Sequence, residues 1–319
     1  MQALRTLIQQ LQAHRPLHID SPAEQPRRAA VCAIFRCRST QQQPIPSNAQ
    51  PPTSIKDFLD QPWVNESEPE LLFIQRATRA TDRWSGHVAF PGGKNEAEET
   101  DEQTAERETL EEIGLDLNSS AFLPVGTLDA REITNMKGEL MMILVPHVYI
   151  QVVPETPPLT IQESEVAVVQ WVPLRFFLSP SPYPDSPLRK SFMIGNVSFP
   201  AIELPTDNEN HHLQLWGLTL GMTRELIELT DTPGSDGRPI WQQFVTMARG
   251  YPRFSHKDMN VLIRFFMYIQ PPKRKQDRER VYMTSLRRAI YVAVLWRIIV
   301  GGVVVGGLTS KLLRLKKYI

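Results

Sequence analysis

The sequence predicts an α/β fold with three layers, helices on both sides of a sheet, followed by further C-terminal helices. Three observations support this prediction. Short apolar runs typical of strands are interleaved with a few helical segments along the 319 residues. An acidic segment with capping signals at both ends follows two adjacent glycines. Near the C-terminal end, twenty consecutive residues carry a single charge.

The individual elements are predicted from apolar runs and from the glycines and prolines that separate them. A helix is expected to start near Asp101 and to end at Gly114. Further helices are expected over residues 218–229 and 257–269. Strands are predicted over residues 29–37, 71–74, 87–90, 123–128, 140–153 and 166–172, with one hairpin within residues 192–204. No internal repeat is present.

The N-terminal segment has a helical apolar stripe with two interpretations, a presequence for mitochondria or a helix packed on the domain. We favour the packed helix; the stripe consists of Leu4, Leu7, Ile8 and Leu11. The predicted parts of the chain are an amphipathic helix with its lead-in (1–26), a main domain with a helical extension (27–270), a basic linker (271–288), a transmembrane helix (289–308) and a basic tail (309–319).

Composition excludes some classes of protein. The chain is 41% hydrophobic and 22% charged, as is usual for a globular protein. Its formal net charge is zero, which argues against a broad basic face, so no nucleic-acid partner is expected. Cys32 and Cys37 are the only cysteines and should point to opposite faces of a strand. We therefore expect no disulfide between them and a reducing compartment.

The acidic helix carries the most informative chemistry. Glu108, Glu111 and Glu112 fall within one arc of a helix surface. Three carboxylates on one face repel one another unless a cation lies between them. Mg²⁺ and similar hard cations bind carboxylate oxygens, usually together with the phosphates of a substrate. The alternative interpretation is a solvated acidic helix without a ligand.

The same segment has the signals of a well-defined helix. Thr100 and Gln103 fit a capping box, and Gly114 is placed to end the helix in a left-handed conformation. Arg107 lies one turn before Glu111 and is expected to form an ion pair with it. The predicted buried stripe consists of Ala105, Thr109, Leu110 and Ile113.

The spacing of these residues resembles the Nudix box. Gly92 and Gly93 permit a backbone bend that lets the chain approach a phosphate closely. From Gly93, five residues lead to Glu99, and seven more lead to the run of residues 107–115. The box pattern is G, five residues, E, seven residues, REUxEExGU, where U is a bulky aliphatic residue. Every fixed position matches except Thr109, which stands where the pattern has an aliphatic residue.

The resemblance implies a mixed sheet between helices and hydrolysis of a nucleoside diphosphate linked to another moiety. It implies Mg²⁺ or Mn²⁺ held by Glu108, Glu111, Glu112 and the Gly93 carbonyl, with Glu99 in the same metal site as a brace. Arg107 would support catalysis by holding the helix and loop. The general base stays open between Glu111, Glu112 and a carboxylate of a later loop, for which the candidate is Glu165.

The segment before the box bears on the substrate. The run LLFIQRATRATDRWSGHVAFPGG resembles the corresponding segment of coenzyme A diphosphatases. With Gly92 and Gly93, Arg83 is the predicted substrate-binding residue. Contact with a 3′-phosphate or pyrophosphate and simple surface pairing are equally open for Arg83. Trp216 matches a helix entry common in that subfamily, and both core packing and substrate contact remain open for it.

The C-terminal run, residues 289–308, has the length needed to cross a bilayer. Seven Lys and Arg residues precede it from Lys273 to Arg288 and four follow it, which would keep the main domain in the cytosol. Arg297 within the run opposes insertion by about 2.5–3.5 kcal/mol. A buried hairpin or an interfacial helix is the alternative. The expected location is the mitochondrial outer membrane or the peroxisome, with the endoplasmic reticulum also open.

The sequence thus predicts a membrane-tethered hydrolase that splits CoA or acyl-CoA into 3′,5′-ADP and 4′-phosphopantetheine. Two alternatives remain at this point. One is hydrolysis of another nucleoside diphosphate derivative, such as ADP-ribose, a nucleotide sugar or a dinucleoside polyphosphate. The other is a catalytically idle scaffold at a membrane. The predicted partners are a small-molecule substrate, a membrane bound through the C-terminal helix, and a second copy of the chain in a homodimer.

Overall fold

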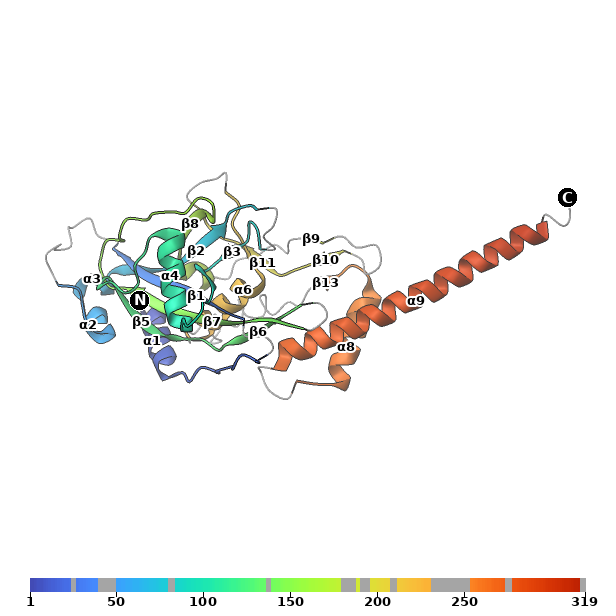
Figure 1. Cartoon of the computed structure of the whole chain (residues 1–319), viewed down its shortest axis with the longest axis horizontal. Coiled ribbons are helices and arrows are strands. Elements are labelled where there is room, and N and C mark those ends of the chain that lie inside the picture. The colour runs from blue at the N-terminus through green and yellow to red at the C-terminus, as the bar shows by residue number, and fades with distance from the viewer. Residues whose placement is uncertain are drawn as a thin grey trace. The chain divides into compact units, whose positions relative to one another are not determined.

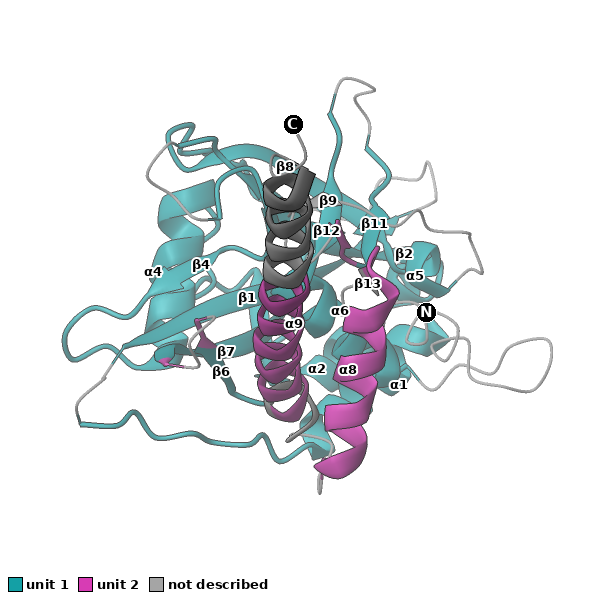
Figure 2. Cartoon of the chain, turned by 90° about the vertical axis from the view of Figure 1, so that its right-hand side faces the viewer, with its two compact units in different colours: residues 1–133, 140–185, 200–250 teal, residues 134–139, 186–199, 251–319 magenta. Residues whose placement is uncertain are grey.

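The structure is a computed structural model. It describes residues 1–23, 27–39, 50–79, 84–135, 139–178, 188–189, 196–206, 211–230, 253–272 and 277–315, of which 188–189, 253, 277–280 and 301–315 are described by their backbone alone. The chain forms two compact units (Figure 2). Unit 1 contains residues 1–133, 140–185 and 200–250, and unit 2 contains residues 134–139, 186–199 and 251–319.

A mixed sheet forms the centre of unit 1. Five strands follow the order β3-β2-β1-β7-β5, while β4 pairs with β1, β6 with β7 and β8 with β2. β1 runs parallel to β7 and antiparallel to β2 and β4, which confirms the predicted mixed sheet. The bounds are β1 (Arg28–Ser39), β2 (Ser67–Arg76), β3 (Val88–Ala89), β4 (Gly92–Lys94), β5 (Phe122–Thr127), β6 (Arg131–Thr134), β7 (Leu140–Gln151) and β8 (Val166–Pro173).

Helices pack on both faces of this sheet, as predicted (Figure 1). On one face, Ala105 and Ile113 of α4 (Asp101–Ile113) pack in the cluster that includes Cys32. On the other face, α1 (Gln2–Ala13) and α6 (Gly217–Glu228) pack in the cluster that includes Cys37. The two cysteines therefore belong to different cores, and both are free and buried.

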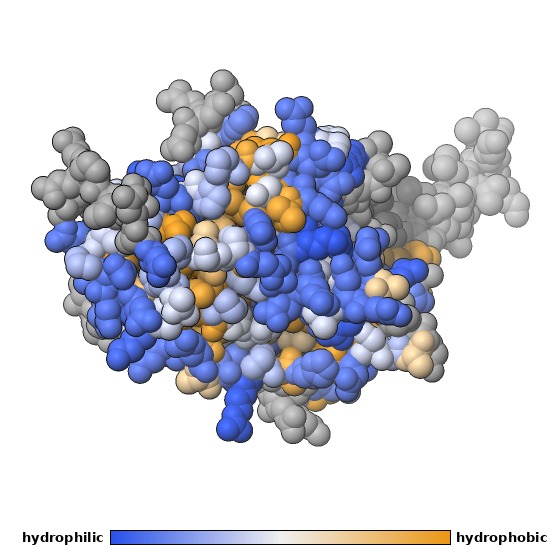
Figure 3. Space-filling model, turned by 60° about the vertical axis from the view of Figure 1, so that its left-hand side comes forward, coloured by the Kyte–Doolittle hydropathy of each residue, from blue (hydrophilic) through white to orange (hydrophobic). Residues whose placement is uncertain are grey.

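The N-terminal apolar stripe is the buried face of α1. Leu4, Leu7, Ile8 and Leu11 are all within the larger core of unit 1, as expected for a helix packed on the domain. Leu11 approaches the backbone of β5 so closely that a side chain at Gly126 would lie 3.1 Å from it. Figure 3 shows one face of the molecule, on which hydrophilic residues predominate and apolar residues form small separate patches.

Short strands and helices complete the fold, and one predicted hairpin has to be corrected. The hairpin predicted within residues 192–204 is wrong, because β11 (Ala201–Glu203) pairs with β12 (Gln214–Trp216). In unit 2, β10 (Val197–Ser198) instead pairs with β9 (Leu188–Arg189) and β13 (Arg253–Phe254). Residues 192–195 lie outside the described residues. Three short helices are α2 (Ile55–Leu59), α3 (Pro62–Asn65) and α5 (Leu174–Leu178).

Two helices dominate unit 2, α8 (Lys257–Ile269) and α9 (Asp277–Leu315). α8 has the bounds that were predicted for it. Among the residues that the structure describes, no helix combines the length and apolar character needed to cross a membrane. The predicted transmembrane helix over residues 289–308 is therefore not supported. Ala289 and Ala293 pack in a core shared by α8 and α9, and Arg297 forms a 2.6 Å ion pair with Asp258 of α8.

Candidate active site

The box helix α4 has the ends that the sequence predicts. Thr100 is its N-cap, and its side chain accepts a hydrogen bond from the Gln103 amide while the Gln103 side chain caps in return. Gly114 ends the helix in a left-handed conformation with φ of 78°. A side chain at that position would lie 2.7 Å from the Thr160 amide nitrogen, so the close approach of a later loop also requires glycine.

The buried stripe of α4 differs from the prediction at one position. Ala105, Thr109 and Ile113 are buried, but Leu110 is 48% exposed. Thr109 donates its hydroxyl proton to the Ala105 carbonyl over 2.6 Å, which satisfies the polar atom in the core. The departure from the aliphatic residue of the box pattern therefore leaves the helix packed on the sheet.

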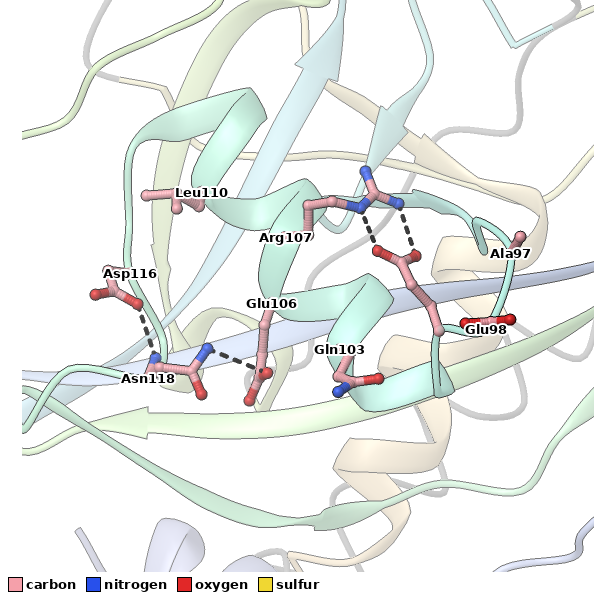
Figure 4. A pocket seen from close by; sticks show the side chains of 9 residues that line it. Ala97, Glu98, Gln103, Glu106, Arg107, Leu110, Asp116 and Asn118 are labelled. Atoms are coloured by element: carbon pink, nitrogen blue, oxygen red, sulfur yellow. Dashed lines mark hydrogen bonds and ion pairs between the residues drawn. The ribbon is translucent and has the colours of Figure 1, made fainter.

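The exposed Leu110 lies at the rim of an open hollow on the outer side of α4 (Figure 4). The hollow has a volume of about 420 Å³. Its lining side chains are mostly polar or charged: Ala97, Glu98, Glu99, Gln103, Glu106, Arg107, Leu110, Asp116 and Asn118. Glu99 and Arg107 line the hollow, whereas Glu108, Glu111 and Glu112 do not.

The two glycines before α4 bring the backbone against the predicted metal ligands. Gly92 has φ of 146°, and a side chain there would clash with the Ala30 carbonyl oxygen. Its amide donates a 2.9 Å hydrogen bond to Oε2 of Glu112. A side chain at Gly93 would occupy the space of the Glu108 carboxylate. Gly92 is therefore required by conformation and by close approach, whereas Gly93 leaves space for the Glu108 carboxylate.

Glu112 is the most buried of the predicted ligands. Its side chain is 1% exposed and forms a 3.4 Å ion pair with Arg76. Burial raises the pKa of Glu112 to about 7; the Gly92 amide and Arg76 lower this pKa, and the neighbouring carboxylates of Glu108 and Glu165 raise it. The buried carboxylate is therefore short of positive charge.

Glu108 lies in a similar environment one helical turn earlier. Burial is the main cause of its raised pKa, which Arg107 opposes and the carboxylates of Glu111 and Glu165 reinforce. Glu111 is 59% exposed and forms a 3.0 Å ion pair with Nη1 of Arg107, as predicted. The three glutamates therefore share one helix but differ greatly in burial.

Arg107 and Glu99 form a clamp between α4 and the loop before it. Nε of Arg107 donates to Glu99 over 2.6 Å, and Nη2 donates to Glu99 and to the Lys94 carbonyl over 3.1 Å each. The Arg107 hydrogen bond is the main cause that lowers the pKa of Glu99 to about 2, with help from the Glu96 amide and the Thr104 hydroxyl. The pair joins α4 to the loop before it, and its role as a brace of a metal site stays a prediction.

Glu165 lies on a loop that the structure joins to α4. Nη2 of Arg79 pairs with Oε1 of Glu165 over 3.1 Å. The Glu165 amide donates to the Gln162 carbonyl over 2.8 Å, and the Gln162 amide donates to the Glu112 carbonyl over 3.0 Å, so the turn that carries Glu165 is bonded to the end of α4. The Glu165 carboxylate contributes to the raised pKa of both Glu108 and Glu112. The sequence argument named Glu165 and missed Arg76 and Arg79, because spacing along one chain does not show which arginine faces a glutamate from another element.

Substrate contact was predicted for Arg83 and left open for Trp216, and the two residues have different outcomes. Arg83 lies outside the described residues, so its role stays a prediction. Trp216 packs edge-on against His87, with ring centroids 4.5 Å apart. His87 directly precedes β3, so this contact ties the start of α6 to the strand that leads into the glycine bend.

The donor set fits a hard divalent cation. Oxygen ligands come from carboxylates that repel one another, and the buried Glu112 and the half-buried Glu108 have raised pKa values that a cation would lower. Within the described residues, however, no three acidic, histidine or cysteine side chains already converge as metal ligands. Glu111 is directed to Arg107, and Glu112 to Gly92 and Arg76. The ligand roles therefore stay predictions.

A mixed sheet between helices and a carboxylate-bearing helix after a glycine bend define the class of this domain: an α/β/α domain with a carboxylate site. The family model described as "NUDIX domain" matches residues 62–192, a range that includes β2, the glycine bend, α4 and β8. The chain therefore contains a Nudix domain.

Comparison with individual proteins gives partial matches. An uncharacterised protein of Schizosaccharomyces pombe is 39% identical over 165 residues, which is 50% of this chain and 45% of that protein. Mitochondrial coenzyme A diphosphatase NUDT8 is 46% identical over 50 residues in Mus musculus, covering 15% of this chain and 24% of the relative. The Homo sapiens protein is 50% identical over 48 residues, covering 15% and 20%. The chain thus spans less than half the length of these relatives.

Solved structures show distant similarity. The Nudix hydrolase RenU of M. smegmatis is 19% identical with a TM-score of 0.30, covering 46% of this chain and 70% of that chain. The C. elegans Ap4A hydrolase in a binary complex is 14% identical with a TM-score of 0.28, covering 45% and 78%.

Proposed function

We propose that this protein is a Nudix hydrolase that cleaves the pyrophosphate linkage of a nucleoside diphosphate derivative. One observation carries the proposal: Glu108 and Glu112, both with raised pKa values, face the backbone of the Gly92–Gly93 bend. Glu108 is half-buried and pairs with Arg107 over 3.1 Å, whereas Glu112 is buried with its nearest arginine at 3.4 Å. A buried carboxylate with little positive charge around it is typical of a site completed by a ligand. A pyrophosphate and its cation would provide the missing charge.

Mg²⁺ or Mn²⁺ is the proposed cofactor, held by Glu108, Glu111, Glu112 and the Gly93 carbonyl. When bound, such an ion neutralises pyrophosphate charge and favours ionisation of a water molecule. The Arg107–Glu99 clamp keeps α4 in register with the loop that carries Gly93, because it joins the helix to the Lys94 carbonyl. These residues thereby support the ligands without contacting the reacting atoms.

A carboxylate of the chain is proposed to take the proton of the attacking water. Hydrolysis adds water across the P–O–P linkage, so the attacking water must lose a proton to a base. Glu165 is the proposed base because its carboxylate is 39% exposed, can reach water, and belongs to a turn whose Gln162 amide is bonded to the Glu112 carbonyl. Glu111 and Glu112 are the alternatives, and Glu111 is the more accessible of the two.

The proposed substrate is CoA or an acyl-CoA, split into 3′,5′-ADP and 4′-phosphopantetheine. Two lines support this choice. The segment that leads into the FPGG run resembles that of coenzyme A diphosphatases. Short matches to the mitochondrial coenzyme A diphosphatase NUDT8 of mouse and human agree with it. Arg83, with Gly92 and Gly93, is proposed to contact the phosphates.

The test is hydrolysis by the purified full-length chain of a panel containing CoA, acetyl-CoA, ADP-ribose, UDP-glucose and diadenosine tetraphosphate, with Mg²⁺, Mn²⁺ or EDTA. We expect metal-dependent formation of 3′,5′-ADP from CoA or acetyl-CoA at the highest kcat/KM. A preference for another compound would reject the CoA assignment while keeping the hydrolase. No turnover of any compound would favour the idle scaffold.

Glu111→Gln and Glu112→Gln test the mechanism in the same assay. Each variant should lose at least about 100-fold in kcat, because a neutral amide binds a divalent cation poorly. Both should keep the far-UV circular dichroism of the wild type. Full turnover in both variants would refute the proposed roles of these carboxylates.

A further inference from the structure

Two segments far apart in the sequence meet beside the last turn of α4. One is the segment 76–79, which begins at the last residue of β2, and the other is the loop of residues 160–165 that precedes β8. We propose that Arg79 is a positioning residue that holds Glu165 toward the carboxylates of α4, so that this glutamate can act on the attacking water. This inference deepens the proposed function and rests on it.

Backbone hydrogen bonds join the 160–165 loop to the end of α4. The Thr160 amide donates to the Ile113 carbonyl over 3.0 Å, and the Gln162 amide donates to the Glu112 carbonyl over 3.0 Å. These carbonyls belong to the last turn of the helix, where intrahelical partners are missing. The loop thus satisfies the helix end, and its first half is held in place relative to Glu112.

The second half of the loop is held by the segment after β2. The Ala77 amide donates to the Glu165 carbonyl over 2.7 Å. Arg79 contacts two consecutive residues, since Nε donates to the Ser164 carbonyl and Nη2 pairs with the Glu165 carboxylate over 3.1 Å. The Arg79 amide in turn donates to the Ser85 hydroxyl over 2.7 Å. Arg79 therefore restrains both the backbone before Glu165 and the direction of its side chain.

Charge explains why this restraint matters. Burial is the main cause of the raised pKa values of Glu108 and Glu112, and repulsion from neighbouring carboxylates, including Glu165, adds to it. Without a counter-charge, the exposed member is the one free to turn away, and Glu165 is 39% exposed. Arg79 supplies a positive charge 3.1 Å from the Glu165 carboxylate and opposes that movement.

The exposure of the Arg79–Glu165 ion pair argues against the alternative that this pair only stabilises the fold. Arg79 and Glu165 are 38% and 39% exposed, and exposed ion pairs contribute about 0–1 kcal/mol to stability. Loss of Arg79 should therefore change the direction of one carboxylate far more than the stability of the domain. This difference separates a positioning role from a structural one.

The experiment compares Arg79→Ala, Arg79→Lys, Glu165→Gln and the double variant R79A/E165Q with the wild type on the best substrate of the panel. Arg38→Ala is the matched control. It also removes one exposed arginine from ion pairs, but its partner Glu68 keeps Arg175 and its partner Glu70 keeps Arg36.

We expect Arg79→Ala to lower kcat about 10- to 100-fold with KM within about threefold, since a well-placed base contributes about 10²–10⁴-fold. Arg79→Lys should recover part of the loss. The double variant should be no slower than Glu165→Gln alone, because both changes disable the same group. Arg38→Ala should match the wild type.

Several results would overturn the inference. They are an unchanged kcat in Arg79→Ala, additive losses in the double variant, or a raised KM at constant kcat, which would make Arg79 a substrate ligand. Hydrogen exchange provides a readout that does not need activity: peptides covering residues 160–166 should exchange faster in Arg79→Ala and not in Arg38→Ala. If the wild type cleaves nothing, the proposed function fails, and unchanged exchange in Arg79→Ala rejects the positioning role separately.

Discussion

The two ends of the box segment use the same type of side chain in opposite electrostatic environments. Glu99, in the loop before α4, accepts hydrogen bonds from Arg107, the Glu96 amide and Thr104, and its pKa is lowered to about 2. Glu112, in the last turn of α4, is 1% exposed, and burial raises its pKa to about 7. The Glu99 carboxylate is satisfied by an arginine at 2.6 Å and by neutral donors, whereas the buried Glu112 carboxylate has one amide and an arginine at 3.4 Å.

This contrast distinguishes a brace from a binding group. The carboxylate of Glu99 is satisfied within the protein, so it contributes to structure and gains little from a ligand. The Glu112 carboxylate is buried against one backbone amide and a 3.4 Å arginine, so a cation would relieve it. Sequence identity to a motif does not separate these roles, whereas burial and hydrogen bonds do.

The largest expected effect comes from removing the backbone support of Glu112. Gly92→Ala would force a side chain into the Ala30 carbonyl at φ of 146°, which should destabilise the domain by about 3 kcal/mol or more. The measurement is urea unfolding followed by circular dichroism. Gly217→Ala is the control, since φ is 63° there but no atom lies within 4 Å of the added Cβ. It should lose only about 1–2 kcal/mol. Equal losses in both variants would show that conformation, and not close packing at the bend, requires Gly92.

The stability of the domain as a function of pH tests the burial of Glu112 directly. The pKa of Glu112 is raised from 4.5 to about 7, so the folded state favours its protonated form. Its contribution to stability is therefore full below pH 4.5 and is lost as pH rises through 7. In EDTA, Glu112→Gln should show a smaller loss of stability over this interval than the wild type, measured by urea unfolding at each pH. Parallel stability curves for the two proteins would contradict the burial argument.

The contribution of Glu99 to stability should depend on pH in the opposite direction to that of Glu112. The pKa of Glu99 is lowered from 4.5 to about 2, so its contribution is full above pH 4.5 and is lost as pH falls through 2. Glu99→Gln should lower stability at pH 7 by about 1 kcal/mol or more, because it weakens charge-assisted hydrogen bonds to Arg107. The difference from the wild type should shrink in acid. A constant difference from pH 7 to pH 3 would mean that packing, not charge, explains the effect.

The box helix was predictable because its signals are local. The capping box at Thr100 and Gln103, the left-handed Gly114 and the Arg107–Glu111 ion pair all depend on residues within a few positions of one another. The central strands were predictable for the same reason, since each is an apolar run of its own. The mixed sheet came from the family resemblance.

Contacts between residues far apart in the sequence could not be predicted. Arg76 and Arg79 face glutamates that lie 36 and 86 residues further along the chain, and no local pattern indicates such pairs. The C-terminal segment illustrates a different failure. Its apolar composition predicted a membrane helix, but the structure packs Ala289 and Ala293 against α8 and pairs Arg297 with Asp258. Composition does not distinguish a face that contacts lipid from one that contacts another helix.

The smallest expected effect concerns the one residue of the α4 stripe that was predicted wrongly. A helical stripe about 100° wide includes Leu110 by spacing, yet the core beneath α4 is already filled by Ala105, Thr109 and Ile113. Because Leu110 is 48% exposed, Leu110→Ser should change stability by about 0.5 kcal/mol or less.

Ile113→Ala, in the same helix, provides the matched comparison and should lose about 2–4 kcal/mol, since Ile113 is fully buried. A loss in Leu110→Ser as large as that in Ile113→Ala would show that Leu110 is covered in solution, by another part of the chain or by a second copy. Analytical ultracentrifugation of the wild type and of Leu110→Ser would then separate these two explanations, because only a second copy changes the sedimentation coefficient with protein concentration.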